Sequence, residues 1–165
     1  MNGFPELETK TAPILVLGLG NLLLSDDGVG PVLVEQLANT AENWNGRVEF
    51  LDGGTQGLAL LGQISGRQAL IIVDALKMGA PAGTIHRLTL NELREVTPGR
   101  GNSGHEGNAG ELLAVAQLLD QLPERLFVVG VEPEKIATGI GLSARVQEAL
   151  EDASSQVNCL LAELR

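Results

Sequence analysis

Short runs of apolar residues alternate along the chain with longer stretches whose apolar residues recur at helical spacing. Residues 14–17 predict a strand buried on both faces, because every position is apolar. Residues 69–73 and 125–131 predict two further buried strands, and residues 48–51 predict a short one. A fifth run, 84–90, alternates apolar and polar side chains, which predicts a strand with one solvent-exposed face.

The stretches between these runs predict helices. Residues 29–41 have apolar side chains on one face and Pro31 in the first turn, where proline is tolerated. A short helix is expected over 58–64, and a longer one over 108–122 opens on the capping pair Asn108 and Glu111. Ser143 is the expected N-cap of a final amphipathic helix that runs to residue 164.

Strands and helices that follow one another in turn are typical of α/β proteins with a largely parallel sheet. We therefore predict a single-domain layered sandwich over residues 1–165, with a mostly parallel, twisted sheet of about five strands and helices on both faces. The length of 165 residues fits one domain of roughly 100–200 residues. Residues 1–12 are expected to be a flexible N-terminal segment.

The charge of the chain excludes several classes of partner. Eleven Lys and Arg against 21 Asp and Glu give a net charge of −10, which repels nucleic acid phosphates and anionic membranes. Residues 1–13 lack the basic start and apolar run of a secretory signal, so we predict a cytoplasmic protein. The single cysteine, Cys159, precludes an internal disulfide and is expected to be buried or half-buried on a helix face.

A glycine-rich stretch follows the first predicted strand. Its Gly18 and Gly20 resemble the start of a dinucleotide fingerprint, but Leu23 stands where the third glycine is required. Asp26 and Asp27 would also repel a pyrophosphate at the start of the next helix. A nucleotide-binding domain therefore remains a disfavoured alternative, which titration with nucleotides would test.

Carboxylates stand at the ends of the predicted strands. One of Asp26 and Asp27 is expected to cap the following helix, and the pair is more than a cap requires. Asp74 follows a buried strand, at the edge of the sheet where α/β proteins form ligand crevices; capping of a turn is the alternative role for it. Asp52 has a similar position, but its simplest role is to hold the turn with Gly53.

The chain has two histidines. His86 is expected on the solvent face of its strand, without a functional role. His105 lies in the glycine-rich segment 98–110, where no packing requirement explains an imidazole, so it is a candidate metal ligand or general base. Two carboxylates and one imidazole at one sheet edge suit a divalent transition metal with open coordination positions.

Residues 17–30 (LGLGNLLLSDDGVG) closely resemble the opening motif of the maturation endopeptidases of nickel–iron hydrogenases. The similarity extends from Ile14 to about Leu150. Further matching segments are 51–57 (LDGGTQG), 70–75 (LIIVDA), the loop around His105, 130–133 (GVEP) and 141–143 (GLS).

This resemblance implies an endopeptidase that removes a C-terminal extension from the hydrogenase large-subunit precursor after nickel insertion. The metal-contacting positions of the family fall on Asp27, Asp74 and His105, and Asp27 and Asp74 are the implied catalytic residues. Some members have Glu where Asp27 stands. Nickel is expected to arrive within the precursor, which is the implied partner of a monomeric enzyme.

The mechanism stays open at this point. No cysteine lies near the proposed site and no Ser–His–Asp set is apparent, which argues against a covalent acyl-enzyme. Hydrolysis of the aspartic type and metal-assisted hydrolysis both remain. A nickel-binding or nickel-sensing maturation factor without hydrolytic activity would use the same three residues and is the main alternative function.

Overall fold

The computed structural model describes residues 11–40, 44–96 and 109–165. The strands are β1 (Ile14–Leu19), β2 (Val48–Gly54), β3 (Ala69–Ala75), β4 (Ile85–Thr89) and β5 (Arg125–Val131). The α-helices are α1 (Val29–Thr40), α2 (Leu61–Ile64), α3 (Leu90–Val96), α4 (Ala109–Leu118) and α5 (Ala144–Glu163). Two 3₁₀ helices, η1 (Ser25–Gly28) and η2 (Gly57–Leu60), precede α1 and α2.

The five strands form one sheet in the order β2-β1-β3-β5-β4. β1 pairs in parallel with β2 and β3, β3 pairs in parallel with β5, and only β4 is antiparallel to its neighbour β5. The mostly parallel sheet predicted from the sequence is therefore confirmed.

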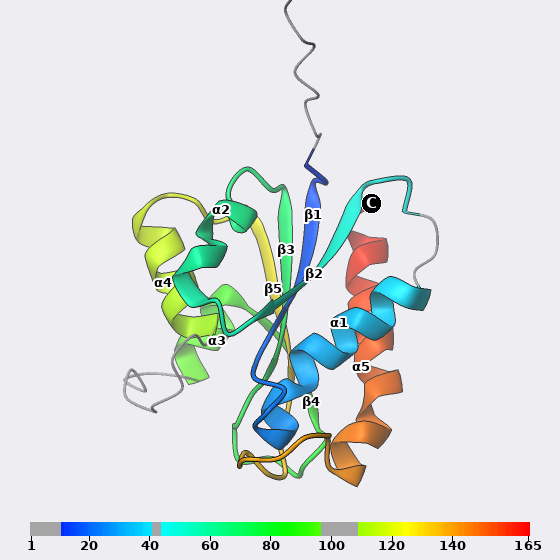
Figure 1. Ribbon diagram of the computed structural model, residues 1–165. Coiled ribbons are helices and arrows are strands. Elements are labelled where there is room, and N and C mark those ends of the chain that lie inside the picture. Colours follow the sequence, from blue (N-terminus) through cyan, green and yellow to red (C-terminus); the bar gives the residue numbers. More distant parts are fainter. Residues whose placement is uncertain (1–10, 41–43, 97–108) are drawn as a thin grey trace, which may run out of the picture.

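Helices cover both faces of this sheet (Figure 1): α1 and α5 lie on one face, and α2, α3 and α4 lie on the other. Alternate residues of β1 enter the two cores, so that Val16 packs with α1 and α5 and Leu17 packs against the opposite layer. This two-sided burial explains why β1 and β3 are apolar without alternation. Among the described residues, no helix is both long and apolar enough to span a membrane.

Three local expectations are wrong. Leu90, the expected last residue of a strand, instead begins helix α3, which was not predicted. Helix α4 ends at Leu118 and not at 122, since Asp120 adopts a left-handed conformation (φ 55°) that stops the helix. Cys159 is exposed, because it lies on the solvent-facing side of α5, whereas Val157 and Leu160 lie on the buried side.

The order of the strands reverses at β1. The chain leaves β1 through α1 to reach β2 on one side, and β3 lies on the other side of β1. In open α/β sheets, ligands bind outside the carboxyl ends of the strands at such a switch point. The residues at the carboxyl ends of β1 and β3 are therefore the candidates for a binding or active site.

Candidate active site

Asp27 and Asp74 meet at this switch point. Asp27 lies in η1, at the end of the loop that follows β1, and Asp74 is the penultimate residue of β3. The two carboxyl groups are close enough for Asp27 to raise the pKa of Asp74 electrostatically. The structure thus brings together two of the three residues singled out in the sequence. The third, His105, lies outside the described residues, as does most of the glycine-rich segment around it.

Glycines allow the segment that carries Asp27 to approach the ends of the strands. A Cβ on Gly30 would lie 2.2 Å from the Leu19 carbonyl oxygen and 2.5 Å from that of Val73. Gly20, with φ of +137°, passes so close to Asp27 that a Cβ would lie 1.9 Å from its carbonyl oxygen. The glycines of the opening motif therefore serve close packing of η1 and α1 on the sheet edge.

Asp74 is a buried carboxyl group with 9 % of its surface exposed. Burial, and then the charge of Asp27, raise its pKa to about 8, although hydrogen bonds from the backbone of Ala75 and Ala109 act in the opposite direction. Near neutral pH, Asp74 therefore holds a proton next to a second carboxyl group.

Asp27 is oriented by its own loop. Its Oδ2 accepts a hydrogen bond of 2.9 Å from the backbone N–H of Asn21. The Asn21 side chain in turn accepts one from the N–H of Leu23 at 2.9 Å. The carboxyl group is thus fixed by the turn between β1 and η1.

Asp26 does not cap α1, as one of the two aspartates was expected to do. It is fully buried, and its carboxylate accepts hydrogen bonds from the backbone N–H groups of Glu134, Lys135 and Ser143 and from the Ser143 hydroxyl. Burial alone would raise its pKa, but these donors hold the pKa of Asp26 below its usual value. Asp26 therefore ties η1, which also carries Asp27, to the loop that precedes α5. Ser143 does stand at the N-cap position of α5, with its hydroxyl directed to Asp26.

His86 is not on a solvent face. Its side chain is only 14 % exposed, and Nε2 lies 2.9 Å from Oε2 of the buried Glu132. Glu132 also accepts hydrogen bonds from the backbone N–H groups of Met78 and Gly79. Burial raises the pKa of Glu132, and the Met78 N–H, His86 and the Gly79 N–H together bring it below its usual value.

His86 lies two strands from Asp74 in the sheet, with β5 between them. Asp74 and His86 are both register partners of Gly130, from β3 and β4 respectively. Glu132 fastens the loop that leaves β3 directly after Asp74. This role of Glu132 was not predicted from the sequence, where its only signal is its place in the GVEP segment 130–133.

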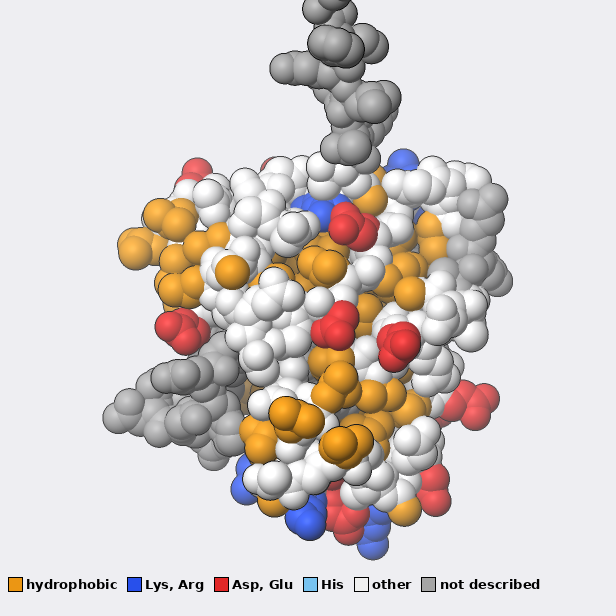
Figure 2. Space-filling model, in the orientation of Figure 1, with side chains coloured by type: hydrophobic (Ala, Val, Ile, Leu, Met, Phe, Trp, Pro, Cys, Tyr) orange, Lys and Arg blue, Asp and Glu red, His pale blue; other side chains and the backbone are white. Residues whose placement is uncertain are grey.

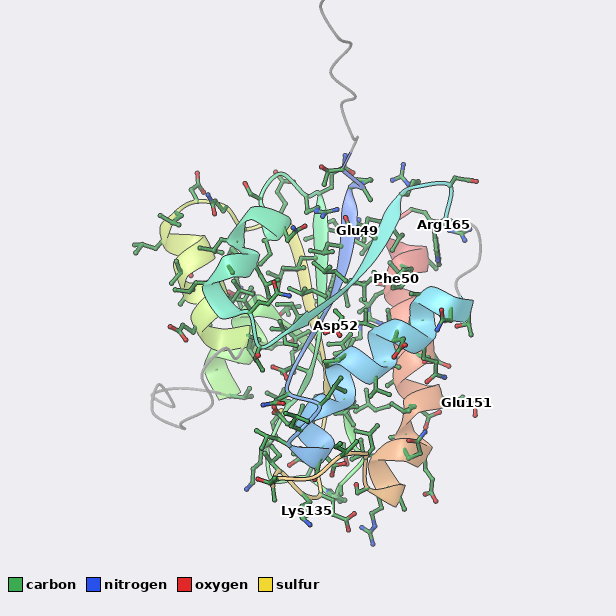
Figure 3. All side chains as sticks on the ribbon, viewed as in Figure 1. Glu49, Phe50, Asp52, Lys135, Glu151 and Arg165 are labelled. Carbon is green, nitrogen blue, oxygen red and sulfur yellow. The ribbon has the colours of Figure 1, made fainter. Side chains whose placement is uncertain are left out.

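Asp52 holds a turn, as expected. Its Oδ1 accepts a 2.9 Å hydrogen bond from the N–H of Gly54, near the carboxyl end of β2 (Figure 3). Beside it lies a hollow of about 210 Å³, which is lined by Gly20, Asn21, Leu22, Pro31, Asp52, Gly54 and Thr55. The hollow therefore adjoins the loop that Asp27 holds.

The described part of the chain contains no cluster of three or more His, Cys, Asp or Glu side chains suited to a metal. Asp27 and Asp74 supply two carboxyl groups, which fit part of the oxygen and nitrogen donor set expected for a divalent transition metal. Their mutual repulsion, which contributes to the raised pKa of Asp74, is of the kind that a bound cation relieves. The two residues are thus compatible with contact to a metal held partly by another molecule.

The fold and the paired carboxyl groups define an α/β protein whose candidate active site lies at the switch point of a mostly parallel sheet. Residues 31–158 match the family model of the hydrogenase maturation protease HycI. The chain belongs to the hydrogenase maturation protease family, which confirms the resemblance seen in the sequence.

Similar proteins support this membership over most of the chain. The Hydrogenase 2 maturation protease of Escherichia coli is 38 % identical over 152 residues, which cover 91 % of each protein. The hydrogenase expression/formation protein HupD of Thiocapsa roseopersicina is 35 % identical over 143 residues; the match covers 85 % of this chain but only 63 % of HupD.

Solved structures show the same fold. The hydrogenase maturating endopeptidase HybD from E. coli superposes with a TM-score of 0.79 at 36 % identity, covering 91 % of this chain and 92 % of HybD. The [NiFe] hydrogenase maturation protease HybD from Thermococcus kodakarensis gives a TM-score of 0.70 at 26 % identity, covering 89 % and 97 %.

Proposed function

We propose that this protein is an endopeptidase that removes a C-terminal extension from the precursor of a nickel–iron hydrogenase large subunit after nickel insertion. The observation that carries the proposal is the pairing of Asp27 with the buried Asp74 at the switch point of the sheet. Membership of the hydrogenase maturation protease family supplies the class of substrate.

The two carboxyl groups divide the chemistry of hydrolysis between them. Asp74, protonated near neutral pH, donates a hydrogen bond to the carbonyl oxygen of the scissile peptide. Asp27, held by the Asn21 N–H through Oδ2, takes a proton from the attacking water through its other oxygen. That proton then passes to the leaving amine. Two neighbouring carboxyl groups that hold one proton are the arrangement of aspartic peptidases.

We further propose that Asp27, Asp74 and His105 contact nickel that is carried by the precursor. A divalent cation there would polarise the scissile carbonyl group or anchor the precursor. Support comes from the two neighbouring carboxyl groups, and from Ala109. This residue is the first described one after the segment that contains His105, and its backbone is hydrogen bonded to Asp74.

The test is to incubate the purified protein with nickel-loaded precursor and to measure the mass of the precursor. We expect the loss of a C-terminal peptide, and its mass identifies the bond that is cut. Asp27→Asn, Asp74→Asn and His105→Ala should abolish the loss. Asp152→Asn is the matched control, because it removes one carboxylate from the exposed side of α5 and should leave trimming unchanged.

Trimming at the wild-type rate by Asp74→Asn would contradict the catalytic pair. An unchanged precursor mass with the wild-type protein would contradict the peptidase. Nickel binding without any trimming would instead identify a non-hydrolytic maturation factor.

A further inference from the structure

Three large apolar side chains are exposed on the loop between β1 and η1 and on the loop before α5. Leu22, Leu23 and Ile140 are 48 %, 60 % and 88 % exposed, and we call them the Leu22–Leu23–Ile140 surface. They come from two loops far apart in sequence, one after β1 and one before α5. Figure 2 shows apolar side chains gathered at this end of the molecule. Contiguous apolar surface of this kind commonly marks a binding site.

The two loops are joined by their backbones. Leu24 and Gly139 form a parallel β-bridge, in which the Ser25 N–H donates to the Gly139 carbonyl and the Gly139 N–H donates to the Leu23 carbonyl, both at 2.9 Å. The Ser25 hydroxyl adds a 2.8 Å hydrogen bond to the carbonyl of Ala137. Leu23 and Ile140 are therefore presented from adjoining segments with fixed backbones.

The buried carboxylate of Asp26 also joins these two loops by hydrogen bonds. It joins η1 to Glu134, Lys135 and Ser143, on both sides of Ile140 in the sequence (Figure 3 labels Lys135). A surface that is ordered before binding loses less conformational entropy when a partner docks. The fold thus presents exposed apolar side chains on two hydrogen-bonded loops. Exposing these side chains does not contribute to the stability of the folded protein.

This surface is continuous with the active site. Leu22 lines the 210 Å³ hollow beside Asp52, and its neighbour Asn21 donates the backbone hydrogen bond that orients Asp27. A chain whose scissile bond lies over Asp27 and Asp74 can therefore extend along this loop to Leu22.

We propose that the Leu22–Leu23–Ile140 surface docks an apolar segment of the hydrogenase precursor that adjoins the bond to be cut. This proposal rests on the proposed peptidase function and names the part of the protein that recognises the substrate chain. Three partly exposed side chains offer roughly 300–400 Å², less than the ~800 Å² per partner that a stable protein dimer needs. The surface is therefore suited to a short segment whose remaining contacts lie in the active site, and not to a second copy of this protein.

The test is the double variant Leu23→Ser/Ile140→Ser, assayed with nickel-loaded precursor over a range of concentrations. Loss of two apolar contacts that are made equally in the bound and reacting states should raise KM by about tenfold or more and leave kcat within twofold. Leu118→Ser is the matched control, because Leu118 is 84 % exposed at the far end of α4 and its loss should leave KM unchanged.

The outcomes separate the two proposals. A wild-type protein that does not trim the precursor contradicts the peptidase function. A wild-type protein that trims, with an unchanged KM in the double variant, overturns the docking surface. So does a concentration-dependent dimer, seen by sedimentation, that the double variant abolishes. Should Leu23→Ser disturb folding, Ile140→Ser alone applies the same test at the more exposed position.

Discussion

Asp26, Asp27 and Asp74 show how the surroundings of one residue type decide what it does. Asp26 and Asp74 are both buried, but Asp26 accepts four hydrogen bonds that hold its pKa below the usual value. Asp74 receives fewer donors and lies beside Asp27, and its pKa is raised to about 8. The first carboxylate is suited to structure, and the second to moving a proton.

Asp74→Asn should make the stability of the protein less dependent on pH. The folded wild type holds the Asp74 proton up to about pH 8, whereas an unfolded chain releases it near the ordinary aspartate pKa of 3.8. The folded state therefore binds more protons between these values, and wild-type stability falls as the pH rises through this window.

Asp74→Asn has no carboxyl group at this position, so its stability should not fall as the pH rises through this window. We expect it to match the wild type near pH 4 and to exceed it at pH 8 by an amount on the order of 2–5 kcal/mol. Urea unfolding at pH 4, 6 and 8 measures the difference. Parallel stability curves for the two proteins would contradict the raised pKa.

Asp26→Ala should destabilise the protein by about 3–5 kcal/mol, because three backbone N–H groups and the Ser143 hydroxyl lose their acceptor. Chemical denaturation at pH 7 measures the loss. Asp152→Ala, which removes an exposed carboxylate from α5, should stay within about 0.5 kcal/mol of the wild type. If both substitutions change the free energy of unfolding by a similar, small amount, Asp26 does not stabilise the two loops that it joins.

The sequence indicated Asp74 because it stands at the carboxyl end of a buried strand, which is the edge of the sheet where α/β proteins bind ligands. It could not indicate the role of Asp26, whose partners lie 108 to 117 residues away along the chain. The His86–Glu132 pair was missed for a related reason. Glu132 is satisfied largely by backbone N–H groups of a loop, and the shape of a loop leaves no periodic pattern in the sequence.

At the scale of elements, the strands were predictable because β1 and β3 pass between two cores and carry apolar residues on both faces. Helix α3 was missed although it has a start signal. The Thr89 N–H donates to the Glu92 carboxylate, and the Glu92 N–H donates to the Thr89 hydroxyl, which is a capping box. The alternating residues just before Thr89 concealed this signal.

Gly30→Ala tests the close packing of α1 on the sheet. The added methyl group would lie 2.2 and 2.5 Å from two backbone carbonyl oxygens, so α1 and the attached η1 must move. We expect a loss of about 3 kcal/mol or more in the free energy of unfolding, together with reduced trimming because Asp27 is displaced.

Gly62→Ala is the matched control for this substitution. Gly62 lies in α2 with no atom within 4 Å of the added Cβ. This change should stabilise the protein by about 0.5–1 kcal/mol. Comparable thermal unfolding of Gly30→Ala and the wild type would contradict the packing argument.

At the scale of the whole molecule, the proposed site is suited to a metal that it shares with its substrate. Two carboxyl groups and one imidazole leave open coordination positions. We predict that protein purified without chelators and then dialysed retains well under one nickel per chain, and that trimming depends on nickel in the precursor.

Elemental analysis of the dialysed protein and parallel assays with loaded and metal-free precursor measure these quantities. One firmly retained nickel per chain, or rapid trimming of metal-free precursor, would contradict a shared site.

The long-range hydrogen bonds of Asp26 also bear on how the enzyme is made. The ribosome synthesises Asp26 and Asp27 early. The residues that donate hydrogen bonds to Asp26, from Glu134 to Ser143, follow more than a hundred residues later. The loop that carries Asp27 therefore lacks these hydrogen bonds until more than four fifths of the chain has been synthesised. We therefore expect trimming activity to arise late in biosynthesis, and a chain that ends before Glu134 to leave the precursor untrimmed.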